Sequence, residues 1–176
     1  KFNPAARPLY TPSSFVAMFA GVRTLFTHCV WADDFSGFDR ELHSLTHCAV
    51  SNRLLSKRTL NLRAALDVGV SLNIGTDGLS SNMSLNFLDE LRANLLIHAE
   101  FDPFELAKIL LLASTKNAAN ALNLDSGEIK TGKLADLALY GGFADADAAQ
   151  LPLMLILHAK GCERLFVGGA EVNLND

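Results

Sequence analysis

Three short β-rich segments with helix-length stretches between them constrain the fold of this chain most. The segments cover residues 24–30, 44–50 and 70–74, and the first two share the sequence Thr-His-Cys. The intervening residues 33–43 and 59–68 are long enough for short helices, and a parallel pair of strands needs a connection of about a dozen residues. The order strand, helix, strand, helix, strand therefore predicts an α/β fold with a parallel sheet.

Helical patterns also lie outside this region. Residues 13–20, 86–99, 102–112 and 114–122 are predicted helices, because their apolar side chains recur at helical spacing or follow a capping signal. The third of them opens with Asp102 followed by proline, a common start for a helix. We expect the second and third of these helices to face a core.

The character of the sequence changes near residue 126. A turn-rich linker at 126–133 leads to a predicted strand at 134–140, and residues 164–172 carry the pattern of a closing hairpin. We therefore predict two domains, residues 1–128 and residues 129–176, of which the second is small and rich in β-structure.

The composition excludes several classes of function. The formal net charge of -4 provides no basic field for nucleic acid, and no apolar run approaches the roughly 20 residues that span a bilayer. Cysteine occurs 3 times, an odd number that favours reduced thiols over a disulfide framework. We expect a soluble, cytoplasmic protein with no nucleic-acid or membrane partner.

We also expect the chain to be a fragment. It begins with Lys1 and not with methionine, and residues 1–12 hold three of the 5 prolines, which is typical of a loop. Its hydrophobic content of 49% is nevertheless enough for a sizeable core.

A carboxylate framed by glycines follows the third β-rich segment. Gly75 and Gly78 allow the backbone to turn sharply, and Asp77 projects from the carboxyl end of the predicted strand, where α/β folds place their chemistry. Asp77 is therefore a candidate catalytic residue. The alternative is a turn-forming aspartate that bonds its own backbone.

The repeated Thr-His-Cys sequences do not form a double Cys-His zinc site. Successive residues of a strand point to opposite faces, so a histidine and the next cysteine cannot aim at one metal. Cys29 and Cys48 are interpreted as small buried apolar side chains. His28, at the end of a strand beside that of Asp77, is a candidate catalytic residue, and a buried histidine bonded to backbone is the alternative.

The remaining histidines receive no catalytic role. A buried structural role is about as well supported as a functional one for His47. His43 and His98 fall on predicted helices, and His158 falls in an apolar segment, so a packed or solvated side chain is the default for all three.

Polar residues beyond two of the strands are candidates for substrate binding. Arg53 could clamp an anionic group of a substrate through its bidentate fork, whereas turn chemistry alone explains the preceding Ser51 and Asn52. Ser81 and Asn82, after Asp77, either help to shape the pocket or cap the next helix.

Four motifs in order carry a family resemblance. They are residues 27–30, residues 47–54, residues 75–78 with Ser81-Asn82, and residues 113–119 with 132–137. Together they resemble the C-terminal half of the amidohydrolase superfamily, in the branch that holds cytosine, guanine and adenosine-type deaminases and triazine chlorohydrolases. The sequences of residues 22–30 and 51–56 are most similar to those of the aminofutalosine deaminases of menaquinone synthesis.

The resemblance implies a fold and a chemistry. The three strands would be numbers six, seven and eight of a metal-dependent (β/α)8 TIM barrel, and the second domain would be the C-terminal part of a small β-sandwich. A divalent metal, zinc or alternatively iron, would activate water for the release of ammonia from an aminopurine nucleoside-like substrate. Asp77 would bind the metal and take the proton of the attacking water, and His28 would orient that water and stabilise developing charge.

Part of the family's machinery does not occur in this sequence. The resemblance also requires a His-x-His pair on strand one, a histidine on strand five and a nearby proton-shuttling glutamate. We expect the remaining metal ligands to lie outside this chain, in an N-terminal half of the same enzyme, and the chain alone to be inactive. The edge strands of the predicted parallel sheet would be exposed, and a second copy of the chain could cover them, so a homo-oligomer is a further candidate arrangement. The alternatives are a chlorohydrolase, another amidohydrolase, or a non-catalytic scaffold of the same fold.

Overall fold

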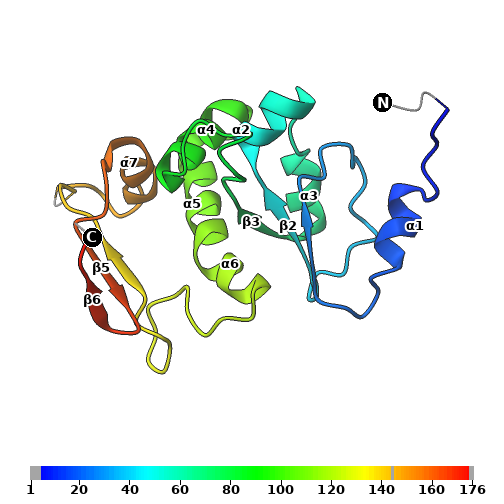
Figure 1. Ribbon diagram of the computed structural model, residues 1–176. Coiled ribbons are helices and arrows are strands. Elements are labelled where there is room, and N and C mark those ends of the chain that lie inside the picture. Colours follow the sequence, from blue (N-terminus) through cyan, green and yellow to red (C-terminus); the bar gives the residue numbers. More distant parts are fainter. Residues whose placement is uncertain (1–4, 144, 175–176) are drawn as a thin grey trace.

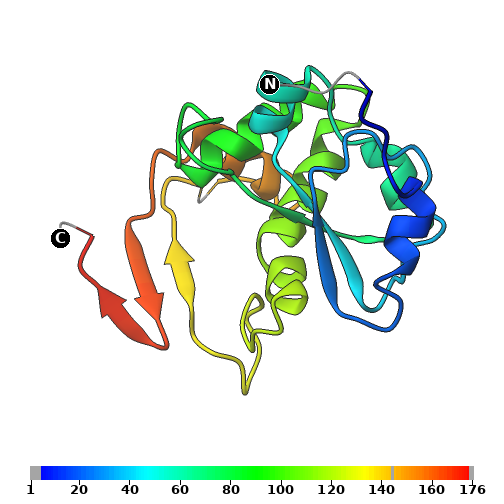
Figure 2. The same cartoon turned by 45° about the vertical axis from the view of Figure 1, so that its right-hand side comes forward.

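The computed structural model of the protein describes residues 5–143 and 145–174. In chain order the elements are α1 (Pro12–Ala17), β1 (Thr24–Thr27), β2 (His43–His47), α2 (Ala49–Ser51), the π-helical turn η1 (Asn52–Ser56), α3 (Leu62–Val68), β3 (Ser71–Ile74), α4 (Phe87–Ile97), α5 (Pro103–Ser114), α6 (Lys116–Ala121), β4 (Leu137–Leu139), α7 (Leu151–His158), β5 (Arg164–Val167) and β6 (Ala170–Val172). Helices α5 and α6 lie between a parallel sheet and an antiparallel sheet (Figure 1, Figure 2).

The predicted parallel sheet is confirmed. Its strands are ordered β1-β2-β3, and Phe26, Leu45 and Leu72 form one row across it. This row belongs to the buried core, which it shares with leucines and alanines of α3 and α5. Central strand β2 is almost entirely buried. The burial of this row fixes the register, because a shift by one residue would turn the apolar side chains to the opposite face.

The helix predicted over residues 33–43 is wrong, because these residues form turns and bends up to the first residue of β2. The carboxylate of Asp34 accepts the backbone N–H of Ser36, and that of Asp39 accepts the N–H groups of Glu41 and Leu42. Such local bonds compete with helical hydrogen bonds. His43 consequently begins β2 and does not lie on a helix.

Strands β1 and β2 end earlier than their sequences predict. The chain leaves β1 at His28, and after His47 it enters α2 and then η1. Ser51, Asn52 and Arg53 therefore lie on helical backbone and not in the turn that we expected. The premise that His28 and its neighbour Cys29 alternate across a strand is also wrong, because both have positive φ angles.

The C-terminal region contains an unpredicted helix. Strands β4, β5 and β6 form the expected antiparallel sheet, but α7 lies between β4 and β5 in the chain and packs against α4 and α5 (Figure 1). Arg92 of α4 donates to the carbonyls of Ile156 and Ala159 at the end of α7. A continuous apolar segment of this length lacks the periodicity that separates helix from strand.

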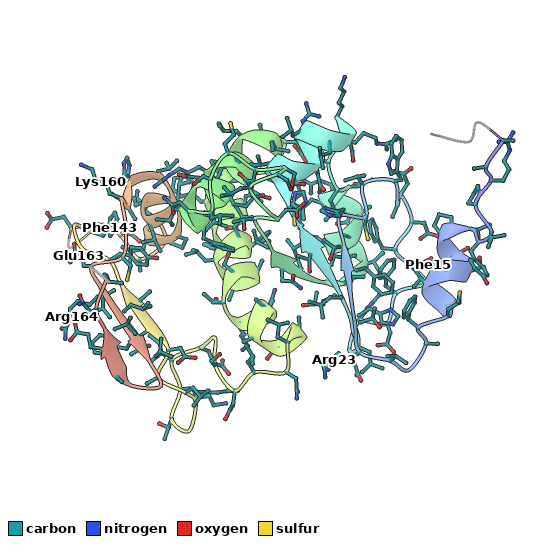
Figure 3. All side chains as sticks on the ribbon, viewed as in Figure 1. Phe15, Arg23, Phe143, Lys160, Glu163 and Arg164 are labelled. Carbon is teal, nitrogen blue, oxygen red and sulfur yellow. The ribbon has the colours of Figure 1, made fainter. Side chains whose placement is uncertain are left out.

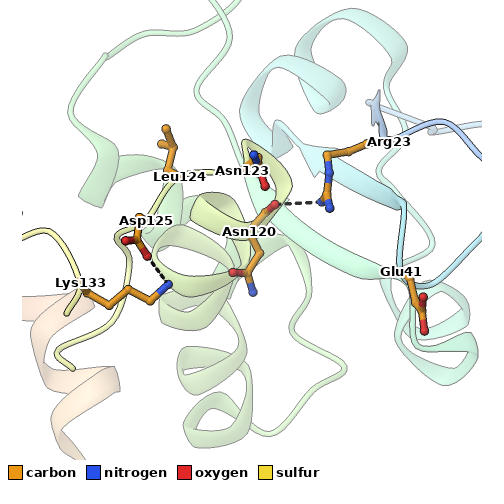
Figure 4. A pocket seen from close by; sticks show the side chains of 7 residues that line it. All are labelled: Arg23, Glu41, Asn120, Asn123, Leu124, Asp125 and Lys133. Atoms are coloured by element: carbon orange, nitrogen blue, oxygen red, sulfur yellow. Dashed lines mark hydrogen bonds and ion pairs between the residues drawn. The ribbon is translucent and has the colours of Figure 1, made fainter. Parts of the chain in front are cut away.

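Two cavities flank the parallel sheet. A polar cavity of about 570 Å³ lies near the amino ends of β1 and β2 (Figure 4), where Arg23 donates to the carbonyl of Asn120 and Lys133 pairs with Asp125 at 2.8 Å. An apolar hollow of about 910 Å³ lies along β1 and α1. Phe15 on α1 borders this hollow, at the end of the molecule opposite Arg164 of β5 (Figure 3).

No helix among the described residues combines the length and apolar character that crossing a bilayer requires.

A pair of histidines is buried between β2 and the end of α4. His47 and His98 are 0% and 1% exposed, and their Nε2 atoms lie 2.9 Å apart. Burial lowers the pKa of His47 to about 3, with a further contribution from His98, and burial also lowers the pKa of His98. Both imidazoles are therefore neutral near pH 7, and one Nε2–H donates to the other nitrogen.

This pair predicts that the free energy of unfolding of the protein decreases at acid pH. The pKa of His47 is about 3 in the folded state, against an ordinary value of 6.5, so between these pH values the unfolded state binds a proton that the folded state does not. The contribution to stability is thus lost as the pH falls from 6.5 toward 3, by up to about 1.4 kcal/mol per pH unit. Denaturant unfolding at pH 7.5, 6 and 5 measures this loss.

The non-titrating variant His47→Gln should show a shallower decline with falling pH than the wild type. His158→Gln, at an exposed position on α7, is the matched control and should follow the wild-type slope. Equal slopes in wild type and His47→Gln would contradict the assignment of acid sensitivity to this pair.

Candidate functional site

The carboxyl ends of the three parallel strands gather the candidate residues. His28 follows β1, Ser51 and Asn52 follow β2, and Asp77 follows β3. Parallel pairing places the carboxyl ends of the three strands at one edge of the sheet, which is where α/β folds build their sites. The structure thus brings together the two residues predicted to be catalytic.

Asp77 is held as a carboxylate by three donors. Its Oδ2 accepts the hydroxyl of Ser51 at 2.6 Å, and its Oδ1 accepts the backbone N–H of Gly78 at 2.9 Å. The hydrogen bond from Ser51 is the main cause that lowers the pKa of Asp77, followed by those from Gly78 and Ser81. Its side chain remains 35% exposed, so the ionised group is open to a ligand.

His28 faces this carboxylate. Its Nε2 lies 3.8 Å from Oδ2 of Asp77, and its Nδ1 lies 2.8 Å from Oδ1 of Asn52. The N–H of Cys29 bonds to the carbonyl of Thr27, which closes a tight turn at His28. The φ angles are 69° at His28 and 58° at Asp77. Left-handed conformations at two facing polar residues are typical of functional sites, where strain is retained for the sake of geometry.

Ser81 and Asn82 lie behind Asp77. Both are buried. The hydroxyl of Ser81 lies 3.0 Å from the hydroxyl of Ser51, and the amide of Asn82 donates to the carbonyl of Thr76 and to the carboxylate of Glu90. These bonds fix the loop that carries Asp77. Neither residue caps the next helix, because Asn86 is the N-cap of α4, and a contact with substrate stays a prediction for both.

Arg53 lies on η1, next to the site in the chain. Its side chain is exposed, and its guanidinium donates to the carbonyl of Lys57 at 3.3 Å. The structure therefore leaves its charged end accessible, and its role toward an anionic substrate group stays a prediction.

Three residues that support the site, Ser51, Asn52 and Glu90, carry no functional signal in the sequence. Ser51 and Asn52 are typical turn residues, and Glu90 is one polar residue of a predicted helix. Glu90 is 1% exposed and accepts from the N–H of Val50 and from Asn82, while burial raises its pKa. The side-chain partners of these three residues lie between 5 and 40 positions away in the chain, so no local helix or turn pattern points to them.

The cysteines form no disulfide bond among the described residues. Cys48 is buried as predicted, whereas Cys29 is half-buried, and all 3 cysteines are free. Burial raises the pKa of both Cys29 and Cys48 to about 11. Both thiols therefore stay protonated near pH 7, and the thiolate is the form that binds metal.

The donors at the site suit part of a metal centre. Asp77 offers an ionised, accessible carboxylate, and His28 offers an imidazole nitrogen beside it. Across residues 5–143 and 145–174, no group of three or more His, Cys, Asp or Glu side chains is placed to hold a metal ion. Catalytic zinc sites have three or more protein ligands, so the described residues supply only part of such a set.

Two curated relatives are similar to this chain. An adenosine deaminase of Helicobacter pylori is 42% identical over 91% of the chain. An aminodeoxyfutalosine deaminase of Nitratiruptor sp. is 34% identical over 97% of the chain. The chain spans only 40% and 42% of the lengths of these two proteins.

Solved structures agree with this likeness. Helicobacter pylori aminofutalosine deaminase in complex with methylthio-coformycin matches with a TM-score of 0.85 and 43% identity, covering 92% of this chain and 40% of that one. A zinc-bound adenosine deaminase of Xanthomonas campestris matches with a TM-score of 0.60 and 27% identity, covering 73% and 31%. The model of the amidohydrolase family matches residues 5–172. The chain belongs to the amidohydrolase family.

Proposed function

We propose that this chain is the C-terminal portion of a metal-dependent hydrolase that deaminates an aminopurine nucleoside-like substrate of the aminofutalosine type, in menaquinone synthesis, with release of ammonia. The observation that carries the proposal is the approach of His28 Nε2 to the ionised Asp77 at 3.8 Å. The names of the relatives, which are deaminases of adenosine and aminodeoxyfutalosine, support the class of substrate.

We propose that β1, β2 and β3 are strands six, seven and eight of a (β/α)8 barrel. The two domains would meet near residue 128, and β4 to β6 would form the C-terminal part of a β-sandwich. The parallel order of the three strands and the likeness to a 43% identical structure support this assignment. Free cysteines support a cytoplasmic location.

The partner that we propose is the N-terminal half of the same enzyme. Among the described residues, strand β1 pairs only with β2, and the apolar hollow along α1 is lined by β1. Exposed apolar side chains of this region include Phe15, Leu25 and Trp31. A preceding barrel strand would pair with β1, cover these side chains and bring the remaining metal ligands.

We propose zinc as the metal, with iron as the alternative, and Asp77 as the ligand from this chain. A zinc-bound relative supports zinc. A divalent cation at this position supplies Lewis acidity, which lowers the pKa of water toward neutrality.

The residues of this chain would then act as follows. Asp77, ionised because Ser51 and Gly78 donate to it, accepts the proton of the attacking water. His28, held by Asn52, directs its Nε2 at the same water and orients it. The water oxygen adds to the carbon that bears the amino group, the proton accepted by Asp77 is passed on to the amino nitrogen, and the carbon–nitrogen bond then breaks, so that the nitrogen leaves as ammonia and the hydroxyl stays on the carbon. Strained backbone at both His28 and Asp77 favours a catalytic site over a non-catalytic scaffold, because such strain is typical of functional sites.

Asp77→Ala in the complete enzyme tests this function. We expect turnover, measured as ammonia release from aminofutalosine-type and adenosine substrates, to fall by more than about 100-fold because the proton acceptor is lost. Bound zinc, measured by elemental analysis, should also fall. Asp67→Ala, at an exposed position on α3, is the control and should keep both. Normal turnover in Asp77→Ala, with the circular dichroism spectrum of the wild type, would reject the assignment.

Arg53→Ala tests the substrate role of Arg53 separately. Because the guanidinium would bind an anionic group, KM should rise for substrates that bear a negative group and stay unchanged for neutral analogues. Steady-state kinetics with a matched pair of such substrates measures the difference. An equal rise of KM for both substrates would count against an anion contact.

A further inference from the structure

A buried series of polar groups begins at His28 and runs away from the site. Asn52 lies between two histidines, with its Oδ1 2.8 Å from Nδ1 of His28 and its Nδ2 3.2 Å from Nδ1 of His47. His47 bonds through Nε2 to Nε2 of His98 at 2.9 Å. Nδ1 of His98 lies 3.4 Å from the carboxylate of Glu100. We call this series, His28–Asn52–His47–His98–Glu100, the imidazole relay.

Glu100, the last member, determines which atom donates and which accepts in each hydrogen bond of the imidazole relay. An ionised carboxylate only accepts hydrogen bonds, and a neutral imidazole has one donor and one acceptor nitrogen. Nδ1 of His98 must therefore donate to Glu100, so that its Nε2 accepts from Nε2–H of His47. The bare Nδ1 of His47 then accepts from the amide of Asn52, which leaves the amide oxygen to accept from Nδ1–H of His28.

The reverse direction is disfavoured at the His98 end, because it would aim a lone pair of His98 at the carboxylate of Glu100, 3.4 Å away. At the other end, Nε2 of His28 lies 3.8 Å from Oδ2 of Asp77, which is too far for a direct hydrogen bond, so this carboxylate does not set the direction. The hydroxyl of Thr59, 3.4 Å from Nε2 of His98, can donate or accept and is compatible with both directions. The inner members are at most 2% exposed, so water cannot readily compensate for a reversed bond.

The neutral state of the two inner histidines agrees with this scheme. Burial lowers the pKa values of His47 and His98, so neither carries a second ring proton near pH 7. A doubly protonated imidazole would turn a donor toward another donor and break the series.

We propose that Asn52 is a positioning residue that holds His28 as the tautomer with its proton on Nδ1, directed at the amide oxygen of Asn52. Nε2 of His28 then presents a lone pair toward the position that the attacking water would take beside Asp77. The buried His47–His98 pair and Glu100 fix which way the amide of Asn52 points. The effect on turnover rests on the proposed function, whereas the tautomer itself does not.

Two substitutions of Asn52 separate positioning from packing. Leucine has a similar size but no polar group, so Asn52→Leu removes the acceptor for His28. Asn52→Asp keeps that acceptor. In the complete, zinc-loaded enzyme with nitrogen-15-labelled histidine, NMR should show the proton of His28 on Nδ1 in the wild type and in Asn52→Asp, and a mixture of tautomers in Asn52→Leu.

The kinetic consequence follows from the same variants. We expect kcat to fall about 10- to 100-fold in Asn52→Leu, with KM for the substrate nearly unchanged, and Asn52→Asp to recover most of that loss. A proton on Nε2 of wild-type His28 would overturn the proposal. So would an Asn52→Leu enzyme that keeps both the tautomer and kcat.

Glu100→Gln decides the matter if Asn52→Leu does not fold. Glu100 is exposed and lies outside the site, and glutamine can donate as well as accept, so the reversed direction becomes allowed. A population of His28 with its proton on Nε2 would support the imidazole relay, and an unchanged single tautomer would overturn it.

The measurements also separate this proposal from the proposed reaction. An inert wild-type enzyme whose His28 carries its proton on Nδ1 would reject the deaminase and support the positioning role of Asn52. An active wild-type enzyme whose His28 carries its proton on Nε2 would reject only the positioning role.

Discussion

Parallel pairing of β1, β2 and β3 is the constraint on which the site depends. Because the strands run in one direction, their carboxyl ends meet at one edge, and His28 and Asp77, 49 positions apart in the chain, become neighbours there. The buried row of Phe26, Leu45 and Leu72 fixes this register. Strained backbone at His28 and Asp77 persists because the packed sheet beneath holds the two chain ends in place.

The backbone after β2 carries the residues that orient the site. Ser51 and Asn52 are consecutive, yet Ser51 bonds to Asp77 and Asn52 bonds to His28. This division is possible because helical backbone turns successive side chains by about 100°, so neighbours reach toward different strands. Both residues are buried, so their bonds are shielded from water and their geometry is fixed by packing. Ser51 therefore helps to keep Asp77 ionised, and the adjacent Asn52 fixes the orientation of the His28 ring.

The sequence predicted the parts of the structure that local patterns encode. The glycine-framed Asp77, the histidine after β1 and the three parallel strands follow from composition and spacing. The missing helix at residues 33–43 reflects competition by Asp34 and Asp39 for local amides. Helix α7 is apolar up to its last residue, His158, which leaves no periodicity to interpret. Ser51 and Asn52 escaped detection because their partners are 26 and 24 residues away.

In the proposed barrel, the strand that completes the fold beside β1 would also complete the active site. The strand that pairs with the free edge of β1 would cover the apolar hollow beside α1, and its own carboxyl end would arrive next to His28. Hydrophobic burial along the strand therefore supplies free energy for bringing further ligands toward Asp77. Burial of apolar surface and assembly of the metal centre are coupled in such an arrangement, so a substitution that weakens the packing of Phe15 or Leu25 would weaken metal binding at a distance.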